Sequence, residues 1–415
     1  MPSSLAPEND RIARAHQLYI LLIQKASRAS AAVTFLWITR RPQPHAILAH
    51  ARDSAHVTRA HTARVMFTAS SSASFAVRAR AAAPSSSSSS SRRRSVRVPA
   101  PRSTALKTRA HARTSPEGVP STAFFSPSKI NLFLRITARR ADGFHDLASL
   151  FHVIDLGDAM TFAKSSSETR DTLVCSDPTI PTDGSNLVIK ALDLFRAKTG
   201  ISQYFWIELE KKVPHGAGLG GGSGNAATTL FAANKLCGSP ATEAELLEWS
   251  GEIGSDISVF FSNGAAYCTG RGEIVEDVEP PLDLGTRMLL VKPPMGCSTP
   301  AIFKALDLDG RSTADPLELL RKISSEGCSE AICINDLEKP AFTVLPELAD
   351  LKARLQANTA KDSVVFMSGS GSTIVVMGDD DIPEFVKQDD TLFKAPTRLI
   401  TRKAGEWYAP TLERA

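Results

Sequence analysis

The segment Pro214–Leu230 (PHGAGLGGGSGNAATTL) constrains this 415-residue chain most, because six of its residues are glycine. It follows an alternating apolar stretch, Phe205–Lys211 (FWIELEK), and leads into an apolar helical pattern from about Asn225 to Leu236. Glycine lets the backbone approach a ligand closely, and the start of a helix offers free N–H groups and a dipole that favour phosphate. The sequence therefore predicts a phosphate-binding loop between a strand and a helix.

Three competing interpretations of this segment are weaker. A flexible linker is disfavoured because strand and helix patterns flank the glycines. The substring Gly216–Gly221 (GAGLGG) formally fits the dinucleotide-binding fingerprint, but two residues separate it from the strand, and helices follow where a parallel strand is required. A Walker loop needs a closing Gly-Lys-Ser/Thr, which this segment lacks. A nucleoside triphosphate held mainly by backbone N–H groups remains.

The region before this loop alternates between apolar and polar residues. In Lys129–Thr137 (KINLFLRIT), the period of two places Lys129 and Asn131 on the same face of a strand. The stretch Leu150–Phe162 is predicted to form one strand, or two strands broken at Gly157. A strand hairpin therefore precedes the glycine-rich segment.

Helical signals lie on both sides of the loop. Asn186–Arg196 (NLVIKALDLFR) has the apolar spacing of an amphipathic helix. After the helix that follows the loop, another is predicted to begin at Thr242, because Glu245 three residues later completes a capping box.

A second unit begins near Met288, where a fresh strand pattern (MLLVKPP) appears. It holds helical patterns near Ala301–Leu306 and Phe342–Leu355, and Val364–Met377 predicts two strands joined by a turn of small residues. Strands and helices mix without strict β-α-β alternation, which favours an α+β fold of two lobes. We expect an amino-terminal lobe over residues 121–285, containing the glycine-rich loop, and a carboxy-terminal lobe over residues 286–415.

Charge divides the chain near residue 115. Residues 1–115 hold 19 Lys/Arg against 3 Asp/Glu, a net charge of +16, whereas residues 116–415 hold 29 against 41, a net charge of −12. The first part is rich in Arg, and the serine run Ser85–Ser91 precedes Arg92–Arg94. This composition is typical of a disordered organelle transit peptide, and we expect a plastid destination, with the mitochondrion as the alternative. Met66 opens a stretch that would suffice as a transit peptide, so it is a second candidate start.

Six cysteines lie in the acidic part, with no C-x-x-C pair, so neither a zinc site nor a disulfide framework is predicted. The apolar runs of the first 115 residues fall well below the ~18–20 residues of a membrane-spanning helix. We therefore expect no membrane association, and the acidic main part argues against nucleic-acid binding.

Five further strings, together with the glycine-rich segment, carry a family resemblance. They are FSPSKINLFLRITARRADGFHDL, GSDISVFF, TGRGE, STPAIF and SGSGST. The loop is similar to that of the galactokinase, homoserine kinase, mevalonate kinase and phosphomevalonate kinase superfamily. Within that superfamily, the six strings in this order resemble the 4-diphosphocytidyl-2-C-methyl-D-erythritol kinases of the non-mevalonate isoprenoid pathway. The resemblance covers the chain from about Phe124 to the C-terminal region and implies a two-lobed α+β small-molecule kinase.

The resemblance implies that ATP, with Mg²⁺, phosphorylates the tertiary 2-hydroxyl of a cytidine-diphosphate sugar alcohol. Asp256 matches the family's candidate base, and Lys129 matches the lysine that pairs with it. Phosphoryl transfer needs a carboxylate to accept the hydroxyl proton, and a nearby ammonium keeps that carboxylate ionised. Without the family, Asp256 would be interpreted as a helix N-cap and Lys129 as a solvated lysine at a strand end.

The resemblance also implies binding residues. The residues matching the nucleotide site are Pro214, His215, Gly216, Ala217, Gly218, Leu219, Gly220, Gly221, Gly222, Ser223 and Gly224, with Asn186 and Lys211 beside the adenosine. The residues matching the substrate site are Asn131, Phe144, His145 and Thr299. A Phe144 ring can stack on cytosine, and a His145 imidazole can hydrogen-bond to its polar edge. The alternatives are a turn histidine for His145, a helix cap for Asn186 and an edge-strand charge for Lys211.

Two positions depart from the family pattern. Gly224 stands where the loop usually has a second Ser, so a hydroxyl near the phosphates is missing, and we expect Gly224→Ser to be neutral or mildly activating. Ser258 replaces a frequent Pro after Asp-Ile, which loosens the expected placement of Asp256.

Two different functions compete with this prediction. Another small-molecule kinase of the superfamily is the nearer one. An RNA-binding module is the second, because the superfamily's amino-terminal lobe shares its architecture with a ribosomal-protein domain, but the acidic charge of residues 116–415 and the lack of basic clusters disfavour it. The sequence supports no prediction of oligomeric state or of protein ligands to Mg²⁺.

Overall fold

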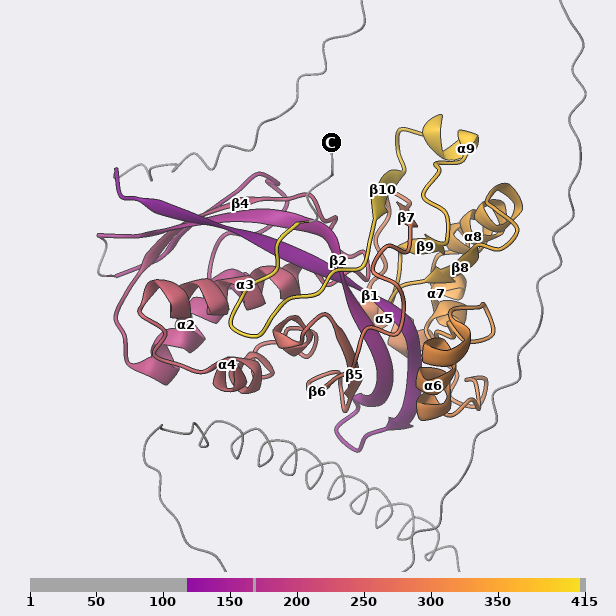
Figure 1. Ribbon diagram of the computed structural model, residues 1–415, viewed down its shortest axis with the longest axis horizontal. Helices are drawn as coiled ribbons and strands as arrows, with labels where there is room; N and C mark the ends of the chain where they lie inside the picture. The colour runs from indigo at the N-terminus through magenta and orange to yellow at the C-terminus, as the bar shows by residue number, and fades with distance from the viewer. Residues whose placement is uncertain (1–117, 167–168, 411–415) are drawn as a thin grey trace, which may run out of the picture. The chain divides into compact units, whose positions relative to one another are not determined.

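A long antiparallel hairpin forms the centre of the fold. The computed structural model describes residues 118–166 and 169–410, so the expected transit segment lies outside the described residues. Strands β1 (Ser121–Arg139) and β2 (His145–Lys164) run diagonally through the molecule (Figure 1). The one-strand alternative is confirmed: β2 is continuous through Gly157, and the ladder shifts register beside it, between Pro127 and Ser128. Such a β-bulge bends the pair without ending it.

The sheet of the amino-terminal lobe grows outward from β2. It contains β3 (Thr172–Cys175), β4 (Phe205–Glu210), β5 (Ala265–Thr269) and β6 (Ile274–Asp277) in the order β3-β4-β2-β5-β6, with β1 paired to β2. Helices α2 (Leu187–Thr199), α3 (Gly221–Leu236) and α4 (Glu243–Ser250) cover one face of this sheet (Figure 1). Buried aromatic and aliphatic side chains from both layers form one core cluster. The predicted helix near residue 186 and the Thr242–Glu245 capping box are both confirmed.

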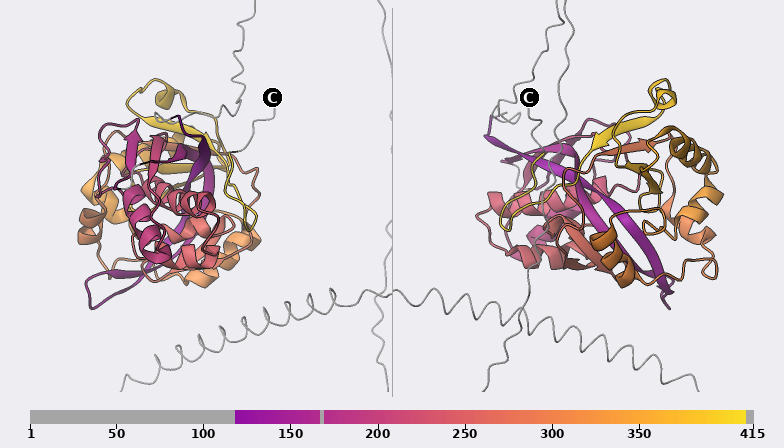
Figure 2. Two further views of the ribbon diagram at one scale, coloured as in Figure 1. Left: turned by 90° about the vertical axis from the view of Figure 1, so that its left-hand side faces the viewer. Right: turned by 45° about the vertical axis from the view of Figure 1, so that its right-hand side comes forward.

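A smaller four-stranded antiparallel sheet organises the other lobe (Figure 2). Its order is β10 (Phe393–Thr397), β7 (Met288–Lys292), β9 (Ile374–Met377) and β8 (Val364–Met367). The helices of this lobe are α5 (Thr299–Ala305), α6 (Pro316–Glu326), α7 (Glu338–Val344), α8 (Glu347–Asn358) and α9 (Glu384–Lys387).

Two helix predictions need correction. The pattern Phe342–Leu355 forms two helices instead of one, because Pro346 disfavours a helical conformation at Leu345, which has φ −137° and ψ 83°. Helix α3 begins at Gly221, four residues before the predicted start near Asn225, so the last glycines of the loop form its first turn. The segment after Asp256 forms a short 3₁₀ helix, η1 (Ser258–Phe261).

The two lobes share β1 and are joined again by the end of the chain. The Leu134 N–H donates to the Ile334 carbonyl at 2.8 Å. After β10 the chain turns back across the hairpin toward α3 (Figure 1). The Trp407 ring of this segment stacks on Phe231 of α3 with centroids 4.6 Å apart. Among the described residues, no helix combines the length and the apolar character needed to cross a membrane.

Candidate functional site

A cavity of about 1080 Å³ is lined by residues of both lobes. Its walls come from β1, the hairpin turn, the glycine-rich loop and the segment before η1 on one side, and from α5 and the turn between β8 and β9 on the other. The predicted site residues that line it are Lys129, Asn131, Phe144, His145, Asn186, Lys211, Pro214, His215, Gly216, Ala217, Gly218, Leu219, Gly220, Gly221, Gly222, Ser223, Asp256 and Thr299. The fold thus brings together residues that lie as far apart in the chain as Lys129 and Thr299.

The carbonyl groups of the glycine-rich loop are occupied by the protein. The Ala217 carbonyl accepts from the Thr373 N–H at 3.3 Å, and the Gly218 carbonyl accepts from the Lys129 Nζ at 3.1 Å. The Leu219 carbonyl accepts from the Lys129 N–H at 2.9 Å, and the Gly220 carbonyl from the Gly224 N–H at 2.8 Å. The loop lines the cavity, and the backbone N–H groups of such a loop at the start of a helix can bind an anion.

Two apolar side chains anchor the loop, and glycine is required where it bends. Ala217 and Leu219 are buried in a core cluster shared with β1 and β7, so their side chains hold the loop and their backbone faces the cavity. Gly218 has φ +74°, and a Cβ there would lie 2.2 Å from the Ser368 carbonyl oxygen. Gly220 has φ +65°, and a Cβ there would lie 2.9 Å from the Lys129 Cε. Larger residues at both positions would displace the loop.

Gly224 differs from the other predicted loop residues. It is buried in α3 and does not line the cavity, so its assignment to the nucleotide site is corrected. A Cβ at Gly224 would lie 2.1 Å from the Pro127 carbonyl oxygen. From this packing we expect Gly224→Ser to be destabilising and not neutral, because the added atoms would force α3 away from β1.

Lys129 and Asp256 form an ion pair within the cavity wall, with 3.3 Å between Nζ and Oδ2. Lys129 lies in the middle of β1 and is 2% exposed, so it is no solvated strand-end lysine. Its ammonium also donates to the Asn131 Oδ1 at 2.9 Å, which confirms that both side chains share one strand face. Asp256 is not an N-cap, because Ile257 occupies that position of η1 and no side chain caps it.

Ser258 supports η1 in a way that the sequence did not reveal. It is fully buried, and its hydroxyl lies 2.9 Å from the Ser250 hydroxyl at the end of α4. We expected the absence of a proline at this position to make the backbone next to Asp256 less rigid. The hydrogen bond between Ser258 and α4 restrains this backbone instead.

Asn131 is held from several sides. Its Nδ2 donates to the Ser149 hydroxyl at 2.8 Å, and its backbone N–H donates to the Ser368 hydroxyl at 3.2 Å. Because Ser368 also donates to the Gly218 carbonyl at 3.2 Å, the turn between β8 and β9 links β1 to the glycine-rich loop.

An aromatic wall lies at the hairpin end of the cavity. His145 stacks on Phe303 of α5 with ring centroids 5.1 Å apart, so it is more than a turn histidine. Partial burial and the nearby Arg139 lower the pKa of His145, so its neutral ring can donate one hydrogen bond and accept another. Phe144 is 57% exposed, and the Arg271 guanidinium lies 5.7 Å from its ring. Thr299 contacts the Ser370 hydroxyl at 2.8 Å.

Asn186 and Lys211 lie at the opposite end of the cavity. The Asn186 side chain caps α2 by accepting from the Val188 N–H at 2.9 Å, so the helix-cap alternative is confirmed while the residue still lines the cavity. Lys211 follows β4, but its ammonium is largely buried and pairs with Asp158. It is therefore no exposed edge-strand charge.

Sequence reasoning missed several cavity residues, among them Phe303 and Arg271. Phe303 lies in the string STPAIF and Arg271 in TGRGE, so the motifs contained both residues without showing which side chains reach the cavity. Their roles depend on contacts across the lobes, which a motif does not reveal.

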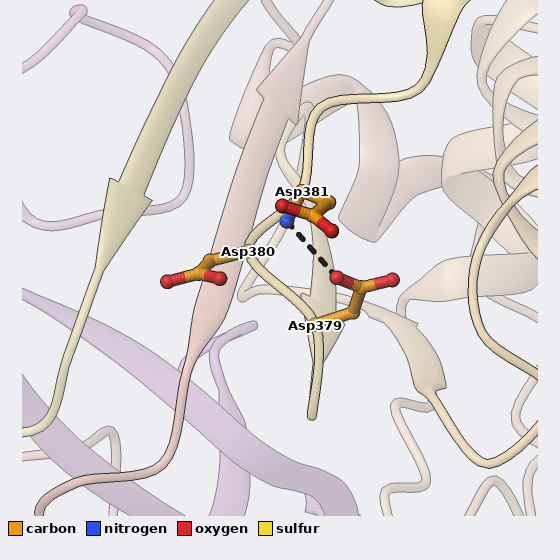
Figure 3. A group of neighbouring side chains, drawn as sticks. All are labelled: Asp379, Asp380 and Asp381. Atoms are coloured by element: carbon orange, nitrogen blue, oxygen red, sulfur yellow. Dashed lines mark hydrogen bonds between the residues drawn. The ribbon is translucent and has the colours of Figure 1, made fainter. Parts of the chain in front are cut away.

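Among the described residues, Asp379, Asp380 and Asp381 are the only cluster of three or more His, Cys, Asp or Glu side chains whose donor atoms lie close enough together to share a metal ion (Figure 3). Local contacts account for it: Asp380 pairs with Arg287 at 2.8 Å, and Asp379 accepts from the Asp381 N–H at 2.9 Å. These residues do not line the cavity, so they add nothing to its chemistry.

Comparison with known proteins identifies the family. Profiles of the GHMP kinases N terminal domain and the GHMP kinases C terminal domain match residues 186–264 and 314–389. The 4-diphosphocytidyl-2-C-methyl-D-erythritol kinase of Solanum lycopersicum, named chloroplastic/chromoplastic, is 56% identical over 295 residues, covering 70% of this chain and 74% of that protein. The chain belongs to the 4-diphosphocytidyl-2-C-methyl-D-erythritol kinase family.

Bacterial family members and solved structures agree with this membership. The 4-diphosphocytidyl-2-C-methyl-D-erythritol kinase of Protochlamydia amoebophila is 46% identical, covering 70% of this chain and 93% of that protein. A crystal structure of 4-(cytidine 5'-diphospho)-2C-methyl-D-erythritol kinase is 28% identical with a TM-score of 0.54, covering 67% of this chain and 99% of that one. A homoserine kinase from Cytophaga hutchinsonii, 16% identical with a TM-score of 0.53, shares the fold. The predicted two-lobed kinase fold is thus confirmed.

Proposed function

We propose that this chain transfers the γ-phosphoryl group of ATP to the 2-hydroxyl of 4-diphosphocytidyl-2-C-methyl-D-erythritol. The observation that carries the proposal is the Lys129–Asp256 pair, which lies in one cavity with the glycine-rich loop at one end and the His145–Phe303 stack at the other. Family membership at 56% identity supports the same reaction.

In this proposal the loop holds the phosphates of ATP. The N–H groups of the loop and of the first turn of α3 donate to the phosphate oxygens. Asn186 and Lys211 lie where the adenosine enters, and Ser223 adds a hydroxyl beside the phosphates. The loop is already held in place by contacts from Lys129, Ser368 and Thr373, so little ordering is needed when ATP binds.

The acceptor hydroxyl is activated by Asp256. The Asp256 carboxylate accepts the hydroxyl proton while the oxygen attacks the γ-phosphorus and ADP leaves. The Lys129 ammonium, 3.3 Å from the carboxylate, stabilises the negative charge on the transferred group. Because Lys129 is fixed by Asn131 and by the Gly218 carbonyl, its charge is preorganised for the transition state.

The donor set of the cavity fits Mg²⁺. Mg²⁺ prefers oxygen ligands and is usually held by substrate phosphates, waters and one or two carboxylates. The Ser223 hydroxyl, beside the glycine-rich loop, is the oxygen donor that would hold it here together with the phosphates of ATP and waters. When bound, the ion neutralises charge on the β- and γ-phosphates.

The cytidine-diphosphate part of the substrate fits the other end. Phe144, His145 and Phe303 present aromatic faces to a cytosine ring, and the neutral imidazole of His145 can bond to the base edge. Arg271 supplies a positive charge beside this wall for the diphosphate. The protein acts in the plastid, as do the plant relatives named chloroplastic.

A substrate panel tests the proposal. The protein starting near residue 118 is incubated with Mg²⁺-ATP and, in separate arms, with 4-diphosphocytidyl-2-C-methyl-D-erythritol, homoserine or mevalonate, and ADP release is followed together with the thermal shift. We expect turnover, and stabilisation beyond that given by Mg²⁺-ATP alone, only in the first arm. Turnover of homoserine or mevalonate alone would assign the chain to another reaction of the superfamily.

A further inference from the structure

A buried carboxylate beneath the glycine-rich loop receives four hydrogen-bond donors. Asp158 lies in β2 directly after Gly157, and it is 1% exposed. Its Oδ1 accepts from the Lys212 N–H at 2.7 Å and from the Val213 N–H at 2.8 Å. Its Oδ2 accepts from the Asn225 Nδ2 at 2.8 Å and pairs with the Lys211 ammonium.

These donors come from both ends of the loop. Lys211, Lys212 and Val213 lead into the glycine-rich loop, whereas Asn225 lies in the first turns of α3, where the loop ends. One carboxylate therefore fixes the point where the chain enters the loop and the point where it leaves. The residues between these points, Pro214 to Ser223, line the cavity.

The same carboxylate determines where the Lys211 charge lies. The Lys211 ammonium also donates to the Asn225 Oδ1 at 3.1 Å, and a Cβ at Gly221 would lie 3.5 Å from it. Lys211 lines the cavity and Asp158 does not. A buried charge that loses its partner is strongly unfavourable, so without Asp158 this ammonium would move toward water.

We infer that Asp158 is a positioning residue for ATP, which holds the Lys211 ammonium and both ends of the phosphate loop in their binding geometry. The inference rests on the proposed function for the identity of the nucleotide. In this inference Asp158 acts on ATP binding, whereas Lys129 and Asp256 act on the acceptor side of the cavity.

Asp158→Asn tests the inference, because it preserves shape and removes the charge. We expect the KM for ATP to rise about tenfold or more while kcat and the KM for the cytidine-diphosphate substrate change less than about threefold. Lys211→Met should raise the KM for ATP as well, and the double variant should be little worse than either single variant, because both remove one interaction.

Asp171→Asn is the matched control. Asp171 is also a buried carboxylate of the same lobe, and it accepts from Arg196 at 2.7 Å and from the Phe205 N–H at 2.8 Å, away from the cavity. It should lower the melting temperature about as much as Asp158→Asn and leave the KM for ATP unchanged. If both variants changed only the melting temperature, Asp158 would be purely structural and the inference would be overturned.

Two further measurements keep the outcome decisive. If Asp158→Asn does not fold, Asn225→Ala removes one of the donors and should raise the KM for ATP to a smaller extent. If wild-type protein does not phosphorylate the cytidine-diphosphate substrate, the proposed function fails, and titration with a fluorescent ATP analogue still tests Asp158. Weaker analogue binding by Asp158→Asn than by Asp171→Asn would support its positioning role, and equal binding would contradict it.

Discussion

At the scale of single residues, burial changes what a side chain does. Lys129 and Asp158 would be ordinary surface charges by residue type, yet both are almost fully buried and surrounded by partners. A buried charge is tolerated only when it is paired and hydrogen-bonded. The partners of these two side chains therefore fix the positions of the charged groups within the fold.

Asp256→Asn should lower turnover by about 10²–10⁴-fold, as expected for the loss of a positioned proton acceptor. The substitution keeps the shape of the side chain, and Lys129 retains Asn131 and the Gly218 carbonyl as partners. The KM for ATP should therefore change little. Steady-state kinetics with both substrates provides the measurement, and near-normal turnover would exclude Asp256 as the base.

His152 should make the folded protein sensitive to acid. Its Nδ1 lies 2.9 Å from the Val153 carbonyl, its Nε2 has no partner among the described residues, and burial lowers the pKa of His152 from 6.5 to about 4. The unfolded chain takes up a proton near pH 6.5 and the folded protein only near pH 4. Stability is therefore fully present above pH 6.5 and falls by about 3 kcal/mol as the pH drops to 4.

Urea unfolding between pH 7 and pH 4.5 measures this effect in wild type and in His152→Leu. The variant should lose less stability on acidification, because the leucine cannot be protonated and Val153 keeps its hydrogen bond from the Ile400 N–H. Equal losses in the two proteins would show that other groups cause the acid sensitivity.

At the scale of elements, the junction between the loop and α3 separates ligand binding from packing. Gly222 and Gly224 both lie in the first turn of α3, two residues apart. A Cβ at Gly222 meets nothing nearer than the Leu187 Cδ1 at 3.9 Å, whereas a Cβ at Gly224 would lie 2.1 Å from the Pro127 carbonyl oxygen. One position faces the cavity and the other faces β1.

Gly222→Ala should therefore affect mainly ATP binding, whereas Gly224→Ser should affect mainly the stability of the fold. Gly222→Ala should keep or slightly raise stability, by up to about 1 kcal/mol, because alanine restricts the unfolded chain, and it should raise the KM for ATP about tenfold because its methyl group enters the cavity. Gly224→Ser should lose about 1–3 kcal/mol of stability through overpacking. Chemical denaturation together with ATP kinetics measures both effects. A fully stable Gly224→Ser with improved kinetics would contradict the observed packing.

At the scale of the whole molecule, the returning C-terminal segment ties the chain's end to the amino-terminal lobe. The Arg402 guanidinium is almost completely buried and donates to the carbonyls of Phe261, Ser262 and Glu406. It also pairs with Glu243 at 2.9 Å. This one side chain joins η1, α4 and the end of the chain.

Arg402→Met should lower the free energy of unfolding by about 3–5 kcal/mol, because it removes a buried guanidinium that donates to three carbonyl groups and pairs with Glu243. Lys403→Met, at an exposed neighbouring position, is the control and should change stability by less than about 0.5 kcal/mol. Guanidinium denaturation of both variants measures the difference. A loss for Arg402→Met no larger than that of the control would show that the segment contributes little.

Much of the fold and site could be predicted from the sequence. The glycine-rich loop, the Thr242–Glu245 capping box and the shared strand face of Lys129 and Asn131 follow from neighbours within a few residues. Such features depend on local backbone geometry, which residue type and spacing determine directly. The motifs also identified the family, because their order along the chain is specific.

Contacts between residues that lie far apart in the chain could be found only in the tertiary structure. The stacking of Phe303 on His145, the four donors at Asp158 and the contact of Gly224 with the Pro127 carbonyl join residues that lie about 50 to 160 positions apart. Hydrogen bonding and close packing act over a few ångströms in space, whatever the separation along the chain. The sequence by itself therefore determined which chemistry this protein carries, and the packing of β1, β2 and α3 decided which residues hold it in place.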